Sequence, residues 1–266
     1  MKRLLPTHWP EYLIEMASLA TFLVSAATFA TLLQHPASPF ASWMASGAVR
    51  RLPMGAAMGP TAVAIIYSRW GRRSGAHMNP VVTLTFLRLR KIAPADAVGY
   101  IAAQFLGGFT GIAIGTLLLA RLPADPSVNY VATVPGEAGV LAAVAAEAII
   151  SFGLMLTVLL LSNDRRMSGF TGVAAGLLVC TYITFEAPLS GMSMNPARSF
   201  GPAILARSVD SLWIYFAGPL VGMVAAAEIY VRVRGRAAVR CAKLHHPATG
   251  TCIFRCGFLA QPEASS

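Results

Sequence analysis

The stretch Gly191-Met-Ser-Met-Asn-Pro-Ala-Arg-Ser-Phe-Gly-Pro-Ala203 decides the fold, because a near copy of its first half stands much earlier in the chain. The earlier copy is Ser74-Gly-Ala-His-Met-Asn-Pro-Val-Val-Thr-Leu84, and both contain Gly-x-x-Met-Asn-Pro. Each lies between apolar segments long enough to cross a bilayer, whereas the run after each proline is too short to cross. Proline suits the first turn of a helix, so each Asn-Pro predicts the start of a half-helix that enters the membrane.

The composition is that of a membrane protein. The chain has 266 residues, of which 56% are hydrophobic and 12% charged, and its mean hydropathy is +0.61. A typical soluble domain is about 25% charged. Six spans of about 20 residues each, with their loops, account for this length and leave no room for a soluble enzyme domain. We therefore expect a membrane protein that is not an enzyme.

The positive charge is distributed unevenly across the predicted topology. The net charge is +10, from 21 Lys and Arg against 11 Asp and Glu. One side carries Lys2, Arg3, Arg69, Arg72, Arg73, Arg88, Arg90, Lys91, Arg165, Arg166, Arg232, Arg234, Arg236, Arg240, Lys243 and Arg255, and the other carries Arg50, Arg51, Arg121, Arg198 and Arg207. The positive-inside rule then predicts a multi-pass protein of the plasma (inner) membrane with both termini in the cytoplasm. Topology and attraction to the lipid bilayer explain the charge, and no motif suggests a nucleic-acid partner.

The sequence predicts an all-α membrane protein with six transmembrane helices and two re-entrant half-helices. The expected spans are Tyr12–Leu33, Pro53–Trp70, Ala97–Ala120, Val140–Leu161, Met167–Ile183 (or on to Pro188) and Leu212–Tyr230. The expected half-helices are Pro80–Leu89 and Pro196–Ala206, and the expected loops include His35–Leu52 and Arg121–Gly136. The channel domain is residues 12–231, between a cytoplasmic N-terminal segment (1–11) and a basic cytoplasmic tail (232–266) that contains Cys and His.

The channel domain consists of two repeats, residues 12–120 and 137–231. Each contains two spans, a Gly-x-x-Met-Asn-Pro half-helix and a third span. Glu15 and Glu147 hold corresponding places, and Tyr100-x-Ala-x4-Gly107 matches Tyr215-x-Ala-x4-Gly222. An odd number of spans reverses the second repeat, so the half-helices enter from opposite faces. Paired interrupted segments of this kind indicate the functional site of a transport protein.

These residues resemble the two signature loops of the aquaporin (major intrinsic protein) family, in a bacterial-type member. Glu15, Glu147, Gln104 and the two Tyr-x-Ala repeats also fall where that family has them. The resemblance covers about residues 12–231. It implies six spans and two half-helices in a right-handed bundle, with one pore in each subunit of a homotetramer. It also implies passive transport of water or a small neutral solute.

The chemistry of such a pore follows from the two loops. Non-helical backbone is tolerated at membrane depth where it lines a wet cavity. The loop backbones of Gly75, Ala76, His77 and Met78, and of Gly191, Met192, Ser193 and Met194, would present a ladder of carbonyl acceptors opposite an apolar wall. Pro80 and Pro196 would start the half-helices, with Asn79 and Asn195 capping them and offering amide donors to the solute. Two facing helix N-termini, each roughly +0.5 charge, would repel cations and protons.

Three polar residues are expected to support these loops. Glu15 and Glu147 would accept hydrogen bonds from loop N–H groups, and Gln104 would assist them. The alternative is that the carboxylates carry protons in a secondary transporter, which also uses broken helices. His77 is expected to fix the loop backbone by hydrogen bonding.

The resemblance implies a selectivity filter around Arg198, whose charge lies inside the membrane. The other filter positions are Ile183, Met192 and either Met58 or Gly59. Ile183 stands where water-selective members commonly have His, so the filter is less polar, which favours glycerol, urea or a similar solute, although the two methionines are bulky. Val81 stands after the first Asn-Pro where the family usually has Ala, as Ala197 stands after the second, and it adds two methyl groups beside the constriction with no assigned effect on permeation. Ser199, Ala203 and the Tyr215-Phe216 pair point to water, and we predict a water channel with a neutral-solute facilitator as the alternative.

The tail contains a group of soft metal ligands: Cys241, His245, His246, Cys252 and Cys256. In a reducing compartment this group favours a Cys3His zinc site over a disulfide. The spacing is irregular, so free or redox-responsive thiols are the alternative. Transport itself needs no cofactor.

Overall fold

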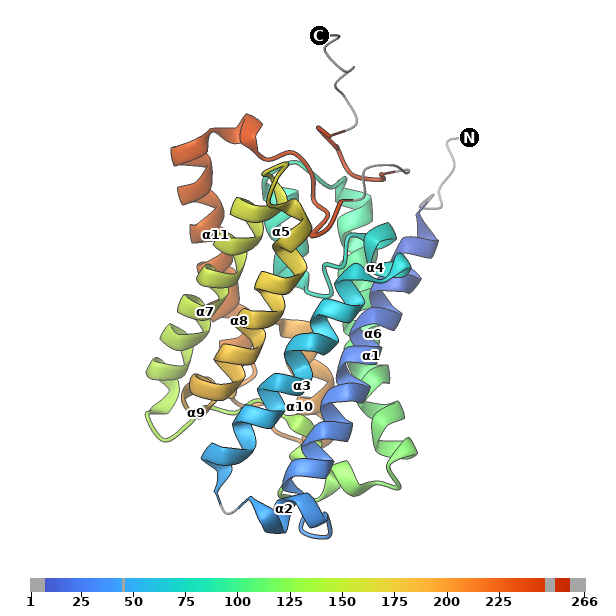
Figure 1. Cartoon of the computed structure of the whole chain (residues 1–266), viewed down its shortest axis with the longest axis vertical. Helices are drawn as coiled ribbons and strands as arrows, with labels where there is room; N and C mark the ends of the chain where they lie inside the picture. The colour runs from blue at the N-terminus through green and yellow to red at the C-terminus, as the bar shows by residue number, and fades with distance from the viewer. Residues whose placement is uncertain (1–7, 45, 247–251, 259–266) are drawn as a thin grey trace.

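The computed structural model describes residues 8–44, 46–246 and 252–258. Within them the chain is a single bundle of helices without strands, which confirms the all-α fold (Figure 1). Residues 1–7 of the predicted N-terminal segment, with Lys2 and Arg3, lie outside the described residues. So do residues 247–251 and 259–266 of the tail.

The two repeats give two sets of helices. The first set is α1 (Trp9–Gln34), α3 (Gly47–Tyr67), half-helix α5 (Pro80–Arg88) and α6 (Pro94–Leu118). The second set is α7 (Gly139–Ser162), α8 (Thr171–Phe185), half-helix α10 (Pro196–Ala206) and α11 (Ile214–Arg234). The shorter elements are α2 (Pro39–Trp43), α4 (Arg69–Ser74), α9 (Ala187–Ser190), η1 (Leu122–Ala124), η2 (Asn129–Val131), η3 (Ser168–Phe170) and η4 (Arg236–Ala238).

Five segments of the described chain are long and apolar enough to cross a membrane: α1, α6, α7, η3 with α8, and α11. Helix α3 has 21 residues but does not meet that criterion; it carries Arg50 and Arg51 near its start and Pro53 and Pro60 inside. It nevertheless packs lengthwise against α8 and contacts α1 (Figure 1). The structure therefore contains the six long helices that the sequence predicts.

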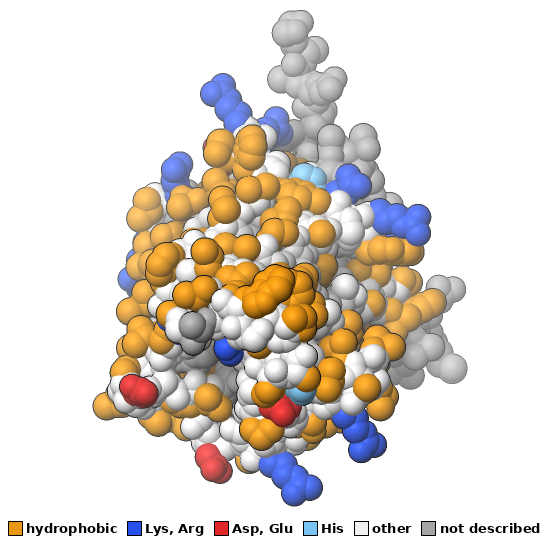
Figure 2. Space-filling view, turned by 60° about the horizontal axis from the view of Figure 1, so that its bottom comes forward, with side chains coloured by type: hydrophobic (Ala, Val, Ile, Leu, Met, Phe, Trp, Pro, Cys, Tyr) orange, Lys and Arg blue, Asp and Glu red, His pale blue; other side chains and the backbone are white. Residues whose placement is uncertain are grey.

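Exposed side chains match a lipid environment. In Figure 2, which turns the bottom of Figure 1 toward the viewer, hydrophobic side chains are spread over the visible surface and most charged side chains lie around its rim. Helix α1 begins and α11 ends at one end of the bundle, called here the terminal end, and α2 lies at the opposite end, the α2 end (Figure 1). All four tryptophans are exposed. Trp9 begins α1 and Trp70 lies in α4, toward the terminal end, whereas Trp43 ends α2 and Trp213 directly precedes α11, toward the α2 end. Such pairs are typical of the two aromatic belts at membrane surfaces.

The predicted loop His35–Leu52 is wrong in part. Pro39 occupies the first turn of α2, and α3 begins at Gly47, where the side chain of Ser46 accepts a hydrogen bond from the Val49 N–H. Arg50 therefore lies in α3, and its guanidinium donates to the carbonyls of Ala41 and Met44 at the end of α2. These bonds satisfy carbonyls that a helix end leaves unpaired.

Two equivalent glycines let helices cross closely in the two repeats. A Cβ on Gly107 of α6 would lie 2.4 Å from the carbonyl oxygen of Met16 in α1. A Cβ on Gly222 of α11 would lie 2.1 Å from the carbonyl oxygen of Ala148 in α7. Met16 and Ala148 directly follow Glu15 and Glu147. The crossings therefore fix the two carboxylates at equivalent depths.

Candidate functional site: two pore loops around a central cavity

The two loops that precede α5 and α10 have the same unusual backbone. Gly75, Ala76 and Met78 have φ values of 98°, 54° and 48°, and the equivalent Gly191, Met192 and Met194 have 82°, 53° and 56°. Left-handed conformations cost most residues free energy and persist where neighbouring groups impose them. The loops are therefore held from outside.

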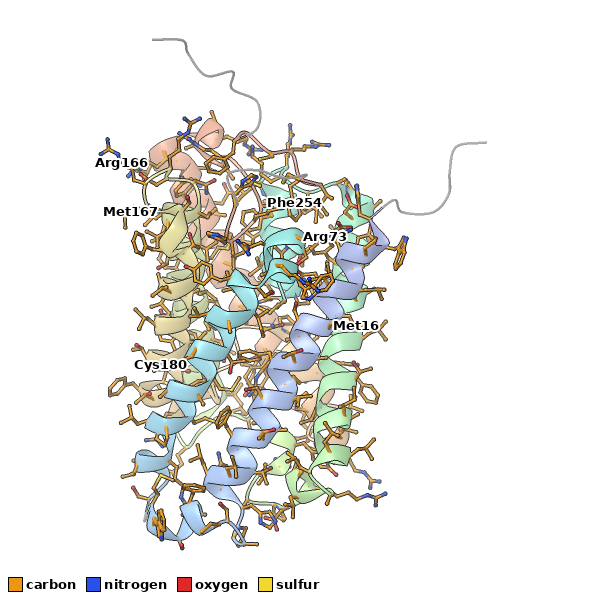
Figure 3. All side chains as sticks on the ribbon, turned by 45° about the vertical axis from the view of Figure 1, so that its right-hand side comes forward. Met16, Arg73, Arg166, Met167, Cys180 and Phe254 are labelled. Atoms are coloured by element: carbon orange, nitrogen blue, oxygen red, sulfur yellow. The ribbon has the colours of Figure 1, made fainter. Side chains whose placement is uncertain are left out.

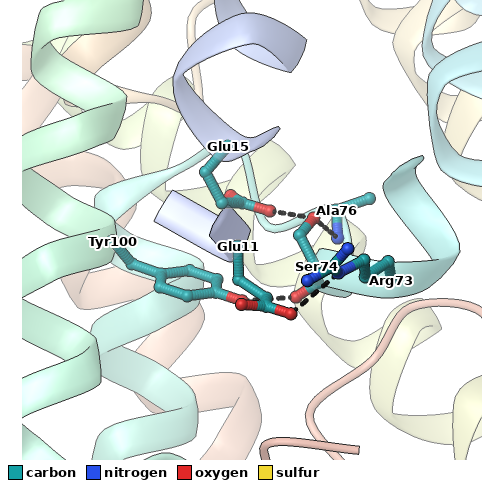
Figure 4. Close-up of polar contacts among 6 residues, drawn as sticks. All are labelled: Glu11, Glu15, Arg73, Ser74, Ala76 and Tyr100. Carbon is teal, nitrogen blue, oxygen red and sulfur yellow. Dashed lines mark hydrogen bonds and ion pairs between the residues drawn. The ribbon is translucent and has the colours of Figure 1, made fainter. Parts of the chain in front are cut away.

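Glu15 holds the first loop, and Figure 4 shows its hydrogen bond with Ser74. Its carboxylate accepts hydrogen bonds from the N–H groups of His77 (3.0 Å) and Met78 (2.6 Å) and from the Ser74 hydroxyl (2.7 Å). The side-chain amide of Gln104 donates to the same carboxylate at 2.8 Å. Glu15 and Gln104 are fully buried. The hydrogen bonds that the Glu15 carboxylate accepts thus come from the loop and from the supporting Gln104.

Glu147 holds the second loop in the same way. It accepts from the N–H groups of Ser193 and Met194, each at 2.7 Å, and from the Ser190 hydroxyl at 2.7 Å. Glu147 is also fully buried. The two carboxylates thus bind equivalent atoms of the two repeats.

In each loop a tyrosine hydroxyl also binds the backbone carbonyl of the serine. The hydroxyl of Tyr100 donates to the Ser74 carbonyl, and that of Tyr215 donates to the Ser190 carbonyl, both at 2.6 Å (Figure 4 shows the first). The sequence analysis quoted Ser74 but gave neither serine a role in holding the loops. A signal was present, because serine precedes the glycine in both copies, which extends the shared motif to Ser-Gly-x-x-Met-Asn-Pro.

The two half-helices meet through their capping asparagines. The Asn79 side-chain oxygen accepts from the Val81 N–H, and that of Asn195 accepts from the N–H groups of Ala197 and Arg198. Each amide nitrogen donates to the opposite loop: Asn79 to the Met194 carbonyl at 2.7 Å, and Asn195 to the Met78 carbonyl at 2.6 Å. Each NH2 has two hydrogens. One is therefore used to join the loops, which the sequence did not predict, and one remains for the cavity.

A cavity of about 480 Å³ runs along the two loops. Both asparagines and loop residues 76–78 and 191–194 line one part of its wall. Apolar side chains line another part: Ile66, Leu154, Met155, Val158, Ala175, Val179 and Ile183. Pro80, Pro196, Val81 and Ala197 are buried outside this lining, and the Val81 side chain belongs to the apolar core. Val82 lines the cavity in its place.

Arg198, Met192 and Ile183 all line the cavity on the α2 side of the asparagines. The Arg198 guanidinium donates to the Val131 carbonyl at 2.9 Å, so a residue of η2 orients it. Met58 also lines the cavity, whereas Gly59 faces α8, where a Cβ would lie 2.6 Å from the Gly176 carbonyl oxygen. Of the two second-span candidates, Met58 lines the cavity and Gly59 does not.

Arg50 and Arg51 line the α2 end of the cavity, and the sequence analysis placed both in a loop. The Arg51 guanidinium donates to the Thr184 carbonyl at 3.2 Å. Together with Arg198, they are the charged side chains among the described residues that line this cavity; His77 is its other titratable residue. No carboxylate is part of that lining. The wall is therefore unfavourable to cations.

His77 is buried at the terminal side of the asparagines and contacts the tail. Its Nε2 lies 2.8 Å from the Ala242 carbonyl, which can only accept, so Nε2 carries a hydrogen. Its Nδ1 then faces the Thr83 hydroxyl at 3.0 Å. His77 holds the loop and the tail together, and the predicted structural role agrees with this geometry.

The tail brings four of the five predicted metal ligands together. One ligand atom from each of Cys241, His246, Cys252 and Cys256 lies within 4.8 Å of the others. A hydrogen bond from the Cys241 thiol lowers the pKa of the Cys252 thiol below its usual value. His245 is not part of the cluster: its ring packs edge-on against Tyr67, with centroids 4.9 Å apart.

The fold and the site together define a membrane protein built from two repeats, with two half-helices that meet at a central cavity. A sequence profile of the family described as Major intrinsic protein matches residues 7–230. The chain therefore belongs to the major intrinsic protein family.

Known relatives agree with this assignment. The chain is 37% identical to aquaporin NIP3-1 of Arabidopsis thaliana over 177 residues, which are 64% of this chain and 53% of that protein. It is 36% identical to aquaporin-4 of Bos taurus over 170 residues, 63% of this chain and 52% of that protein. The chain thus spans about half the length of the curated relatives it matches. The solved aquaglyceroporin of Plasmodium falciparum has the same fold, with a TM-score of 0.69, 20% identity, and coverage of 86% of this chain and 98% of that one.

Proposed function

We propose that the chain is a passive channel that conducts water down an osmotic gradient and excludes ions and protons. The meeting of Asn79 and Asn195 at the cavity supports this proposal most directly. Each amide offers one hydrogen to a passing oxygen, and the N-termini of α5 and α10 add positive potential at the same depth. Water entering there donates its own hydrogens outward in both directions, which interrupts a proton-conducting chain.

The wall of the cavity supports passive transport over coupled transport. A cation-coupled transporter needs carboxylates or other cation ligands in its path. The carboxylates of Glu15 and Glu147 accept hydrogen bonds from the loop N–H groups and serine hydroxyls, and neither residue lines the cavity. The charged groups of the lining are arginines. A secondary transporter is therefore the weaker alternative.

A facilitator of small neutral solutes, such as glycerol or urea, is the second candidate. The observation that favours it is the apolar filter: Ile183, Met58 and Met192 all line the cavity near Arg198. An apolar wall lowers the cost of passing the carbon skeleton of a polyol. The bulk of the two methionines opposes it, because long side chains narrow the passage.

Stopped-flow light scattering of proteoliposomes tests both candidates. An impermeant osmolyte measures water flux, and glycerol or urea then measures solute re-entry. Fast shrinkage with slow re-entry supports the water channel, and fast re-entry supports the facilitator. If neither flux exceeds that of protein-free liposomes, the proposed channel function is wrong.

We propose that the terminal end faces the cytoplasm of the plasma (inner) membrane. Arg72, Arg73, Arg88 and Lys91 lie in or beside α4 and α5, whose basic ends are at the terminal end. This concentration of basic residues supports the orientation. Reporter fusions after α11 should be active only in their cytoplasmic form. Periplasmic reporter activity would reverse the orientation.

We also propose a homotetramer, in agreement with the resemblance of the pore loops. Every subunit contains a complete cavity, so each would conduct independently. Light scattering coupled to size-exclusion chromatography, with the detergent mass subtracted, should give four copies of the 28.1 kDa chain. A single copy in detergent and after cross-linking in membranes would contradict this assembly.

A further inference from the structure

The tail segment after α11 packs onto the first pore loop at the terminal end of the cavity. The Leu244 N–H donates to the Gly75 carbonyl at 3.1 Å, and the Ala242 carbonyl accepts from His77. The Phe254 ring stacks on His77 with centroids 5.4 Å apart, and Figure 3 shows Phe254 at the terminal end of the bundle. Leu244 and Phe254 are 6% and 5% exposed. Two separate parts of the tail, around residues 242–244 and 254, therefore contact one loop.

The cysteine and histidine cluster joins these two parts. Cys241 and His246 flank the first part, and Cys252 and Cys256 flank the second. The sulfurs of Cys241 and Cys252 are 3.5 Å apart, and the sulfur of Cys256 is 3.1 Å from Nε2 of His246. Tetrahedral zinc with Zn–S distances of about 2.3 Å places sulfur ligands roughly 3.8 Å apart. The four ligand atoms thus need only small shifts to surround one ion.

The surroundings suit a Cys3His site as well. Three thiolates with one Zn²⁺ have a net charge of −1, and the segment supplies basic residues beside it: Arg240, Lys243 and Arg255. Hydrogen bonds to the bundle position the segment on both flanks, from the Arg240 N–H to the Asn163 side chain and from the Arg255 N–H to the Lys91 carbonyl. The scaffold of the site therefore rests on the membrane domain.

Leu244 connects the cluster to the pore. Its side chain lines the cavity together with Ala76, His77 and Val158. Leu244 lies between two of the ligands, Cys241 and His246, so its position depends on what the cluster holds. An apolar side chain at the mouth of a narrow pore obstructs the passage of water.

We propose that Cys241, His246, Cys252 and Cys256 bind Zn²⁺, and that the bound ion holds Leu244 across the terminal end of the pore and lowers its permeability. The binding half of this proposal is independent of transport, and the regulatory half rests on the proposed channel function. Loss of the ion would remove the ligand bonds that join the two tail parts through the cluster. The hydrogen bond from the Gly257 N–H to the Arg240 carbonyl would still join them, and contacts with Gly75, His77, Asn163 and Lys91 would still hold the segment on the bundle, so Leu244 would be held less firmly.

Metal binding is tested on the purified full-length protein under reducing conditions. Elemental analysis should find one zinc ion per chain, and Co²⁺ added after stripping should give thiolate charge-transfer absorption.

Cys256→Ser should weaken Zn²⁺ binding by more than the roughly 10–100-fold that loss of an outer partner costs. Cys180→Ser is the matched control, because Cys180 lies within α8, away from the tail (Figure 3). His245→Ala is the matched control for His246→Ala. Zinc-free protein with a Cys241–Cys252 disulfide would overturn the site.

Regulation is tested by osmotic shrinkage of proteoliposomes, first with the zinc-loaded protein, then after a membrane-permeant chelator, and again after Zn²⁺ is restored. Permeability should rise several-fold on stripping and fall on reloading, and Leu244→Ala should be permeable in both states. Using the wild-type chain avoids any dependence on the folding of tail variants. Equal permeability with and without one bound zinc would overturn the regulatory role. If neither state conducts, the channel proposal fails with it, while the zinc content still decides the binding site.

Discussion

The two pore loops are held by the same kinds of side chain, called here the shared frame: Glu15, Ser74 and Tyr100 for the first loop, and Glu147, Ser190 and Tyr215 for the second. Each loop is also contacted by a different part of the chain, called here its brace. In both, a buried glutamate binds two N–H groups and a serine hydroxyl, and a tyrosine binds the serine carbonyl. The two loops differ at one position, which is His77 in the first loop and Ser193 in the second. His77 of the first loop contacts the tail through the Ala242 carbonyl, whereas the equivalent Ser193 contacts the Ser199 hydroxyl, which in turn bonds to Thr133 at 2.7 Å.

The second brace comes from the segment between α6 and α7. The Val131 carbonyl orients Arg198, and the Gly136 N–H donates to the Leu189 carbonyl next to the second loop. The tail and this segment thus occupy equivalent places at opposite ends of the cavity. The duplicated frame fixes the geometry of the centre, while the braces distinguish the ends: Arg198 at one, Leu244 with the Cys and His cluster at the other.

The shared frame should be the most sensitive part of the molecule. Glu15→Ala and Glu147→Ala each leave two buried backbone N–H groups unpaired, and each such group costs about 1–3 kcal/mol. We expect a loss of roughly 2–6 kcal/mol and a large drop in the unfolding temperature in detergent, similar in the two variants.

Glu228→Ala is the control for these variants. Glu228 forms an ion pair with Arg88 in which both side chains are partly exposed, so its loss should cost at most about 1 kcal/mol. Unfolding temperatures of the two frame variants equal to that of the control would show that the carboxylates do not hold the loops.

The glycine crossings behind the frame should come next in size. Gly107→Ala and Gly222→Ala each force a Cβ against a backbone carbonyl, which only separation of the helix pair relieves. We expect each to cost about 1–3 kcal/mol, measured as a lower unfolding temperature in detergent. Gly169→Ala is the matched control, because a Cβ there meets nothing within 4 Å. Stability equal to this control in both variants would contradict the close crossings.

Arg198→Ala should remove the positive charge that distinguishes the α2 end of the cavity from its terminal end, and it should leave the shared frame in place. The variant loses the hydrogen bond to Val131 and the positive charge at the filter, but both asparagines and both glutamates stay in place. We expect normal folding and a glycerol or urea permeability that rises relative to water by about 10- to 100-fold, equivalent to about 1.4–2.7 kcal/mol of barrier.

Stopped-flow measurements of both fluxes check this ratio, with Arg121→Ala as an exposed control outside the cavity. An unchanged ratio in a folded Arg198→Ala protein would remove Arg198 from the filter.

Sequence patterns predicted the duplicated part of the molecule well, because its signals are local. Asn-Pro marks the N-cap and first residue of a helix, and the predicted half-helix Pro196–Ala206 agrees with α10. The loop predicted for residues 35–52 was wrong in part, since Pro39 begins a helix as readily as it ends one. The choice between Met58 and Gly59 needs the rotation of α3 about its axis, which its packing on α8 determines.

The braces could not be predicted because their contacts join distant parts of the chain. The bond between His77 and Ala242 spans 165 residues, and that between Arg198 and Val131 spans 67. Neither the tail nor the segment between α6 and α7 repeats a pattern found elsewhere. The group of cysteines and histidines in the tail indicated ligands for a metal, but only the packing of Tyr67 on His245 separates this residue from His246.

The smallest expected effect concerns the apolar wall opposite Arg198. Ile183→His places a hydrogen-bonding ring where the cavity now has an aliphatic side chain. A polar wall binds water oxygen and hydrogen well and gives less room to a carbon skeleton, so the ratio of water to glycerol flux should rise. We expect a change of roughly two- to tenfold, since a single hydrogen bond exchanged with water is worth about 0.5–1.5 kcal/mol. Ile183→Val is the control for a change in volume without polarity. A larger ratio in the valine variant than in the histidine variant would mean that width, and not polarity, decides which solute passes this end of the pore.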